Sequence, residues 1–218
     1  LRRDLPLQIR AVGFERGTIV YIREPACMHC GKPLKLDSEE YCSDCRGRKS
    51  FVRQGKSVWL HSGPVPGAVY RFKYHNRRRY GQIFAKEMAE RYEDQIRKWK
   101  IEEIIPVPLH RKKKKKRGYN QAEIIAAELA ACVHLPVRND VLFRVKDTKP
   151  QKQFDNRERK RNLQGAFAVS RNWIPCRNVL LIDDIYTTGS TIERSAKMLK
   201  KAGAENVYFL TVSIGQGL

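Results

Sequence analysis

The sequence has no run of eighteen apolar residues, and its first residues lack the apolar segment of a secretory signal peptide. These absences predict a protein without a membrane span and favour a cytoplasmic location. Acidic residues are also scarce. The chain has 23 Asp and Glu and 44 Lys and Arg, which gives a formal net charge of +21. Such a charge favours a polyanionic partner, whether nucleic acid, a phosphorylated substrate or an acidic protein.

A complete P-loop and internal repeats are missing as well. The only Gly-Lys-Ser sequence, residues 55–57, follows Ser50 at the position where a P-loop requires glycine. A P-loop nucleotidase and a repeat protein are therefore both disfavoured. With 218 residues, the chain can form one sizeable hydrophobic core and a small appendage.

Residues 179–192, VLLIDDIYTTGSTI, contain four apolar residues, two carboxylates and a turn rich in hydroxyl groups and glycine. The apolar run predicts a strand buried on both faces of a parallel sheet. The turn predicts a helix start, with Thr or Ser as the N-cap residue. Backbone N–H groups and hydroxyls at such a start favour phosphate binding.

The carboxylates Asp183 and Asp184 can accept hydrogen bonds from sugar hydroxyls or lie near a magnesium ion. One ligand satisfies both ends of this stretch, namely a ribose that carries a phosphate. Two other interpretations stay open. The strand could be the Walker B strand of a nucleotidase, or it could belong to an ordinary strand–turn–helix unit without a ligand.

Six cysteines are present, and four of them form two C-x-x-C pairs separated by eleven residues, namely Cys27, Cys30, Cys42 and Cys45. This spacing predicts a structural zinc site with four thiolate ligands, and a redox pair or disulfides are the alternative. A segment with so few apolar residues needs the metal in order to fold. Cys132 and Cys176 are isolated, and we expect them to be core or incidental residues.

Seven consecutive cations follow a predicted strand: Arg111, Lys112, Lys113, Lys114, Lys115, Lys116 and Arg117. By charge alone such a run predicts a solvated, mobile loop. Its position after a sheet strand gives a second possibility, because ligands bind beyond the carboxyl ends of parallel strands. A further possibility is that the run binds nucleic acid and that aromatic rings near cations stack on bases, with burial of most of these rings in the core as the alternative. The rings are Trp59, Tyr70, Phe72, Tyr74, Tyr80 and Tyr119.

Residues 146–162 form a long polar and basic stretch with one aromatic residue. A long loop without secondary structure in a compact domain is usually functional or disordered. We interpret this one as a mobile flap over the site, with a disordered insertion as the alternative. Its candidate contact residues are Gln153, Arg157, Arg161 and Asn162.

Hydrophobic periodicity predicts helices over residues 81–100 and 120–132, and strands over residues 18–22, 103–108, 141–145, 165–169 and 206–212. The first of these helices carries an apolar stripe of Phe84, Met88, Tyr92, Ile96 and Trp99, and Val69, Phe72 and Tyr74 are apolar anchors before it. Alternation of strands and helices from about residue 100 predicts an α/β fold with a parallel sheet flanked by helices. We place a small N-terminal zinc-ribbon module in residues 1–56 and the larger domain in residues 57–218.

The stretch 179–192 resembles the PRPP-binding motif of type I phosphoribosyltransferases, where PRPP is 5-phosphoribosyl 1-diphosphate. Together with the cysteine pairs, the IIPVPLH and RGYNQAE sequences and the basic flap, in that order, the chain resembles the competence-associated ComF family. The resemblance covers nearly everything from Cys27 to Val212. It implies a phosphoribosyltransferase-like domain over residues 57–218.

The resemblance also implies roles for individual residues. Asp183 and Asp184 would contact the ribose hydroxyls of PRPP and act as catalytic residues if the protein is an enzyme. The 5′-phosphate would be held by Thr187, Thr188, Gly189, Ser190 and Thr191. The loop at residues 107–111, with Val107 and Pro108, would hold the diphosphate, and magnesium would accompany it.

At the level of function, the resemblance implies handling of single-stranded DNA during natural transformation, together with a partner helicase or recombination mediator. Two alternatives stay open. One is a phosphoribosyltransferase of nucleotide salvage with an unidentified acceptor. The other is a zinc-containing nucleic-acid-binding protein whose transferase fold has lost its ligand.

Overall fold

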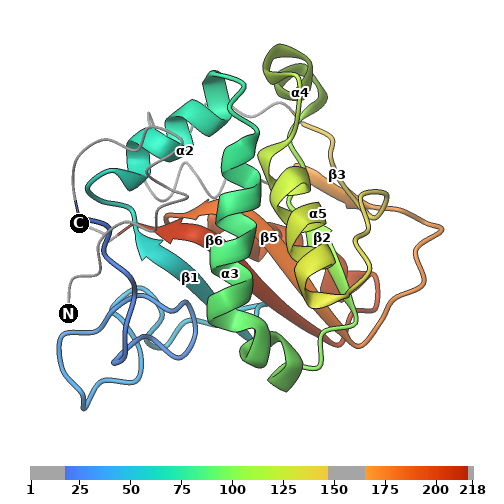
Figure 1. The fold of residues 1–218 in the computed structure, drawn as a ribbon. Coiled ribbons are helices and arrows are strands. Elements are labelled where there is room, and N and C mark those ends of the chain that lie inside the picture. The colour runs from blue at the N-terminus through green and yellow to red at the C-terminus, as the bar shows by residue number, and fades with distance from the viewer. Residues whose placement is uncertain (1–17, 147–164, 216–218) are drawn as a thin grey trace.

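The computed structural model describes residues 18–146 and 165–215 (Figure 1). The predicted flap therefore lies outside the described residues, apart from residue 146. Along the chain the elements are β1 (Gln54–Leu60), α2 (Val65–Tyr74), α3 (Arg79–Lys98), β2 (Glu103–Pro106), α4 (Arg111–Arg117), α5 (Gln121–Val133), β3 (Leu142–Arg144), β4 (Phe167–Val169), β5 (Asn178–Tyr186), α7 (Ser190–Lys201) and β6 (Asn206–Ile214).

The main sheet has the strand order β1-β6-β5-β2 in the described part of the chain, and each neighbouring pair is parallel. This confirms the predicted α/β class with a parallel sheet flanked by helices. The strands β3 and β4 lie outside this sheet and pair with each other in antiparallel fashion. The predicted alternation of helices with parallel strands is therefore wrong for β3 and β4.

Two apolar layers cover the two faces of the sheet. Buried residues of α2, α3 and α5 form one layer, and Figure 1 shows α3 and α5 lying across that face. Buried residues of α7 and the four paired cysteines belong to the other layer. Successive side chains of β5 alternate between the two, since Leu180 and Ile182 contact the first layer while Val179 and Leu181 contact the second. The predicted burial of β5 on both faces is confirmed.

The apolar stripe predicted on α3 is buried, which confirms its role in the core. Val69 and Phe72 are buried as expected, but Tyr74 is 56% exposed, so it is not a core anchor. The predicted strand over residues 18–22 is not formed. In its place an isolated bridge joins Tyr21 to Trp59. The segment that pairs with the sheet is instead β1, which the sequence analysis did not identify. The boundary placed between residues 56 and 57 falls within β1.

The cationic run forms the helix α4 rather than a loop. Lysine and arginine are good helix formers, and both ends of the helix are capped. The His110 ring accepts a hydrogen bond from the Lys112 amide, and Gly118 ends the helix with φ at 83°. Lys114 also forms an ion pair of 2.8 Å with Glu123 of α5. Among the described helices, none combines the length and hydropathy that a membrane crossing requires.

The edge strand β1 is joined to β6 by a buried hydroxyl pair. Ser57 Oγ and Thr211 Oγ1 lie 2.6 Å apart and face each other across the register. Replacing Thr211 with valine should lower the free energy of unfolding by about 1–3 kcal/mol, because the Ser57 hydroxyl loses its partner while remaining buried.

Urea unfolding measures this change directly. The double variant Ser57→Ala/Thr211→Val is the control, because removing both hydroxyls leaves neither one buried without its partner and should recover part of the lost stability. Equal destabilisation of the single and double variants would contradict the importance of the pair.

Candidate functional site

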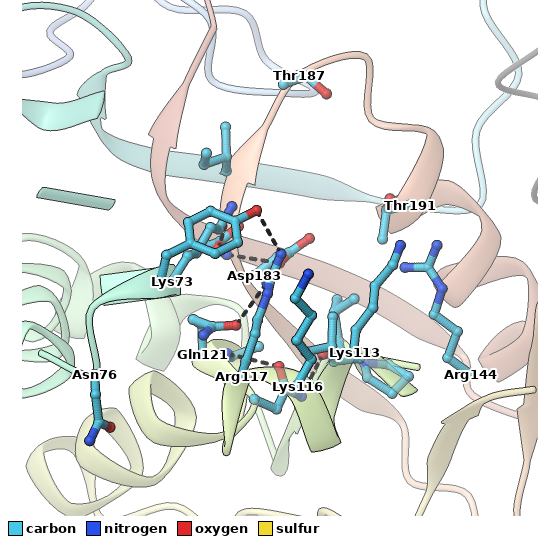
Figure 2. A pocket seen from close by; sticks show the side chains of 18 residues that line it. Lys73, Asn76, Lys113, Lys116, Arg117, Gln121, Arg144, Asp183, Thr187 and Thr191 are labelled. Atoms are coloured by element: carbon cyan, nitrogen blue, oxygen red, sulfur yellow. Dashed lines mark hydrogen bonds and ion pairs between the residues drawn. The ribbon is translucent and has the colours of Figure 1, made fainter. Parts of the chain in front are cut away.

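A pocket of about 640 Å³ lies at the carboxyl ends of β2 and β5, between α2, α4, α5 and β3 (Figure 2). It brings together residues that are far apart in the sequence. Its lining consists of Lys73, Tyr74, Asn76, Val107, Pro108, Leu109, Lys113, Lys116, Arg117, Asn120, Gln121, Ala122, Arg144, Asp183, Asp184, Ile185, Thr187 and Thr191. This is the end of the sheet at which ligands of open α/β folds bind.

The two carboxylates at the end of β5 lie in different surroundings. Asp184 is buried and forms an ion pair of 2.7 Å with Lys73 of α2. Asp183 accepts a hydrogen bond from the Asp184 amide at 2.9 Å. Burial and the neighbouring Asp184 carboxylate raise the pKa of Asp183 to about 7, and the pull of Lys73 and Arg144 offsets only part of that rise. One carboxyl of the pair therefore ionises only near neutral pH.

The helix α4 presents three of its cations to the pocket. Lys113, Lys116 and Arg117 have the i, i+3, i+4 spacing of one helical face, and all three line the pocket. Figure 2 shows them extending, with Arg144, toward the space beside Asp183 and Thr191. Counting Lys73, five cations surround two carboxylates, so the pocket attracts anions.

The turn after β5 has the geometry of an anion-binding loop. Gly189 adopts φ at 71°, and a side chain there would collide with the Tyr186 hydroxyl. Gly189 is also the N-cap residue of α7, so the expected Thr or Ser N-cap was wrong. The Thr188 and Ser190 hydroxyls lie 2.9 Å apart, which fixes the middle of the loop. Thr187 and Thr191, the first and last residues of the loop, both line the pocket.

Two polar residues at the start of α5 support the opposite side of the pocket. Asn120 caps α5 through the Ala122 amide and donates a 3.0 Å hydrogen bond to the Val107 carbonyl. This bond fixes the backbone of the loop that follows β2. Gln121 is buried, and its Nε2 has no hydrogen-bond partner among the described residues. A buried donor without a partner at a pocket wall suits an anionic ligand.

The structure therefore brings Asp183, Asp184, Thr187, Thr191 and the two predicted loop residues Val107 and Pro108 to one pocket. Thr188, Gly189 and Ser190 lie in the same loop without lining the pocket. Sequence reasoning missed further lining residues, namely Lys73, Asn76, Asn120, Gln121 and Arg144, and it named Tyr74 only as a core anchor and a candidate ring for base stacking. Only Asn120 carried a local signal, because it is a helix-capping residue type immediately before an apolar-periodic segment.

Four of the aromatic rings proposed to stack on bases are buried and unavailable, namely Trp59, Phe72, Tyr80 and Tyr119. Tyr70 and Tyr74 are each 56% exposed, and their ring centroids lie 4.9 Å apart. The Arg117 guanidinium lies 4.7 Å above the Tyr74 ring. An exposed aromatic pair therefore borders the cationic pocket.

The four paired cysteines are buried together, with their sulfur atoms all within 4.8 Å of one another. The sulfurs of Cys30 and Cys42 lie 3.7 Å apart. A tetrahedron with metal–sulfur bonds of about 2.3 Å has edges of about 3.8 Å, so the cluster can hold a tetrahedral metal ion. Of the two isolated cysteines, Cys132 is exposed and Cys176 is partly buried, so neither is fully buried in the core.

The pocket also suits a magnesium ion that arrives with a polyphosphate. Magnesium in proteins is usually held by one or two carboxylates together with substrate phosphates. Asp183 and Asp184 offer such oxygens in a pocket that otherwise attracts phosphate. Lys73 already neutralises Asp184, so a metal ion bound there would replace or add to an existing positive charge.

These features define an α/β protein with a pocket of five cations and two carboxylates at the carboxyl ends of a parallel sheet, and with a four-cysteine cluster that can hold a metal ion. No protein-family model matches the chain. It is 33% identical over 188 residues to competence protein F of Haemophilus influenzae, a match that covers 84% of this chain and 82% of that protein. The chain belongs to the family of competence protein F, which confirms the predicted resemblance.

Other similar proteins include competence protein ComFC of Bacillus subtilis, with 28% identity over 85% of this chain and 76% of that protein. DNA utilization protein YhgH of Shigella flexneri is 26% identical over 83% of this chain and 80% of that protein. A solved purine phosphoribosyltransferase from Pyrococcus horikoshii matches 62% of this chain and 85% of its own, with 16% identity and a TM-score of 0.40.

The raised pKa of Asp183 predicts a pH-dependent effect of Asp183→Asn. The folded protein keeps a proton on this carboxyl from about pH 4 to about pH 7, whereas the unfolded chain has lost it. Stability therefore falls as the pH rises through this window, and asparagine removes the cost of the buried charge. The variant should melt near the wild-type temperature at pH 4 and a few degrees higher at pH 8, since ~1 kcal/mol corresponds to ~2–4 °C.

Differential scanning calorimetry at pH 4, 6 and 8 checks this expectation. The control is Asp140→Asn, because Arg138 lowers the pKa of the Asp140 carboxyl and its neutral replacement should give no gain at pH 8. A gain for Asp183→Asn that is equal at every pH would contradict the assigned ionisation.

Proposed function

We propose that this protein binds PRPP or a closely related ribose phosphate, and also single-stranded DNA, and that it acts in DNA uptake in the cytoplasm. The observation that carries the proposal is the pocket itself. It places the carboxylates of β5, the hydroxyls of the following loop and the cations of α4 around one space. A ribose with phosphates on two sides matches this distribution of groups.

In this assignment the ribose hydroxyls donate to Asp183 and Asp184. The 5′-phosphate lies against the loop formed by Thr187, Thr188, Gly189, Ser190 and Thr191, where the start of α7 adds a partial positive charge. The diphosphate lies along Val107 and Pro108 toward the cationic face of α4. Lys73 must then release or share Asp184 as the ribose enters.

Catalysis is an extension of the same site. Displacement at ribose C1 would leave diphosphate facing Lys113, Lys116 and Arg117, which stabilise its developing charge. The carboxylates of Asp183 and Asp184 would hold the ribose as positive charge grows on its ring. Magnesium bound with the diphosphate would supply further neutralisation of the leaving group. The acceptor is unidentified, and a phosphoribosyltransferase of nucleotide salvage is the alternative function.

Support for the DNA-binding part comes from three observations. The relatives are named as competence and DNA utilization proteins. Arg111, Lys112 and Lys115 are exposed on α4, outside its pocket-lining face. The exposed pair Tyr70 and Tyr74 borders the same region and offers rings for base stacking. A helicase or recombination mediator is the partner expected for a protein that handles incoming single strands.

Two matched double variants separate the two binding functions, because each removes two charges from the same helix. Lys113→Ala/Lys116→Ala should weaken PRPP binding by about tenfold or more, since hydrogen bonds to charged groups contribute ~1.5–3 kcal/mol. Lys112→Ala/Lys115→Ala should leave PRPP binding within about twofold. For single-stranded DNA the second variant should lower the slope of log affinity against log salt by about 1.4.

Calorimetric titration of PRPP with magnesium and fluorescence titration of labelled DNA at several salt concentrations measure these effects. PRPP binding that is equally weak in both variants would contradict the assignment of PRPP to the pocket-lining face of α4 and of DNA to its exposed face. DNA binding without any PRPP binding would favour the alternative of an inactive transferase fold. Turnover of PRPP with a base, without salt-dependent DNA binding, would favour nucleotide salvage.

We also propose that the metal of the four-cysteine cluster is zinc in a structural site, because thiolates suit this ion and the module has few apolar residues of its own. One zinc per chain is expected by elemental analysis. A chelator strong enough to remove it should lower the melting temperature by several degrees. An unchanged melting curve after zinc loss would contradict a structural role.

A further inference from the structure

The helix that begins at the phosphate loop carries a carboxylate that is bonded to the cysteine module, defined here as residues 26–53. This carboxylate is Glu193, which lies in the first turn of α7 and is 9% exposed. Its backbone N–H donates to the carbonyl of Gly189 at 2.8 Å. A movement of Glu193 therefore moves the turn that closes the loop.

Four groups of the cysteine module surround this carboxylate. Ser50 Oγ donates to Oε1 at 2.5 Å, and the Phe51 amide donates to Oε2 at 3.1 Å. His29 Nε2 and Arg48 Nη2 lie 3.7 and 3.8 Å from Oε1. Burial raises the pKa of Glu193, but these groups outweigh burial and leave it below its ordinary value. The carboxylate thus stays charged inside the protein because the module supplies its partners.

The position of these partners depends on the cysteines. His29 lies between Cys27 and Cys30 within one C-x-x-C pair, and Arg48 and Ser50 follow Cys45 closely. The Arg48 amide donates to the Cys45 carbonyl at 3.1 Å, and the Gly55 amide of β1 donates to the His29 carbonyl at 2.7 Å. A metal ion in the cluster fixes both pairs of cysteines. It therefore fixes the position of His29, in the first pair, and of Arg48 and Ser50, which follow the second pair.

A second contact path joins the module to the loop. The buried Tyr186 ring stacks on Phe209 at 4.9 Å, and its hydroxyl lies against Gly189. Tyr186 and Phe209 belong to the same buried cluster as the four paired cysteines. Gly55 of β1, whose amide is bonded to His29 of the module, packs on the same Phe209 ring without room for a side chain. The loop therefore rests on a surface that the module helps to form.

We propose that Glu193 is a positioning residue that makes ribose-phosphate binding depend on the metal content of the cysteine module. With the metal bound, the module holds Glu193 and the first turn of α7, so the loop at residues 187–191 is ready to receive phosphate. Without the metal, His29, Arg48 and Ser50 lose their fixed positions, and the buried carboxylate loses its partners. The loop then becomes mobile and its affinity for phosphate falls. This inference depends on the proposed function, because it names what regulates that same pocket.

The experiment compares the full-length, zinc-loaded wild type with Glu193→Gln, before and after zinc removal by a chelator. Calorimetric titration measures PRPP affinity in all four states, at a temperature where circular dichroism shows each protein folded. In the wild type, zinc removal should weaken PRPP binding about tenfold or more. In Glu193→Gln, binding should be weaker from the start, and zinc removal should change it by only about twofold. A structural role alone predicts the same zinc effect in both proteins.

Ser50→Ala tests the contact from the side of the module and serves in place of Glu193→Gln if the latter does not fold. The matched control is Glu205→Gln, which removes an exposed carboxylate paired with Arg177 at 2.7 Å after the end of α7. It should behave as the wild type. A full zinc effect in Glu193→Gln, or no zinc effect in the wild type, would overturn the proposal.

Hydrogen exchange in the absence of any ligand separates this inference from the proposed function. Amides of residues 187–193 should exchange faster after zinc removal and in Glu193→Gln, but not in Glu205→Gln. If the wild type shows these changes yet binds no PRPP, the proposed ligand is wrong, but the dependence of the loop on the metal of the cysteine module is supported. If the wild type binds PRPP and the exchange rates do not change, that dependence is wrong while the function stands.

Discussion

Burial of β5 on both faces is the constraint on which the rest of the structure depends. Its side chains alternate between a layer of three helices and a layer shared by α7 and the cysteine module. Both layers must form for the strand to be covered, which is why a fold of this modest length includes the module in its core. The strand then delivers Asp183 and Asp184 at its carboxyl end, where an apolar environment gives way to a polar pocket.

The pocket balances charge internally. Two adjacent carboxylates repel each other, and burial increases that repulsion. Two features reduce this repulsion. Lys73 neutralises Asp184, and Asp183 keeps its proton up to about neutral pH. The remaining cations come from α4 and β3, so the pocket as a whole favours an anion even though its most prominent sequence motif is acidic.

The sequence predicted the parts of the fold that are encoded locally. The strand of β5, the glycine-containing loop, the stripe of α3 and the cysteine spacing each follow from residues close together in the chain. Lys73, Arg144 and Glu193 could not be found in this way, since their significance comes from partners in distant parts of the sequence. Charge patterning also misjudged residues 111–117, because a run of lysines with a capping histidine and a terminal glycine is as compatible with a helix as with a loop.

The uniform composition of α4 has a consequence for how the protein tolerates change. Rotating a helix by one residue turns it by about 100°, which ordinarily exchanges one side chain type for another on each face. In α4 every position from Arg111 to Arg117 is a cation, so a slip in register or a one-residue deletion still presents positive charge both inward and outward. The helix thus carries a property that depends on composition rather than on exact alignment. A substitution at one position therefore removes one charge and leaves the rest of the helix positive.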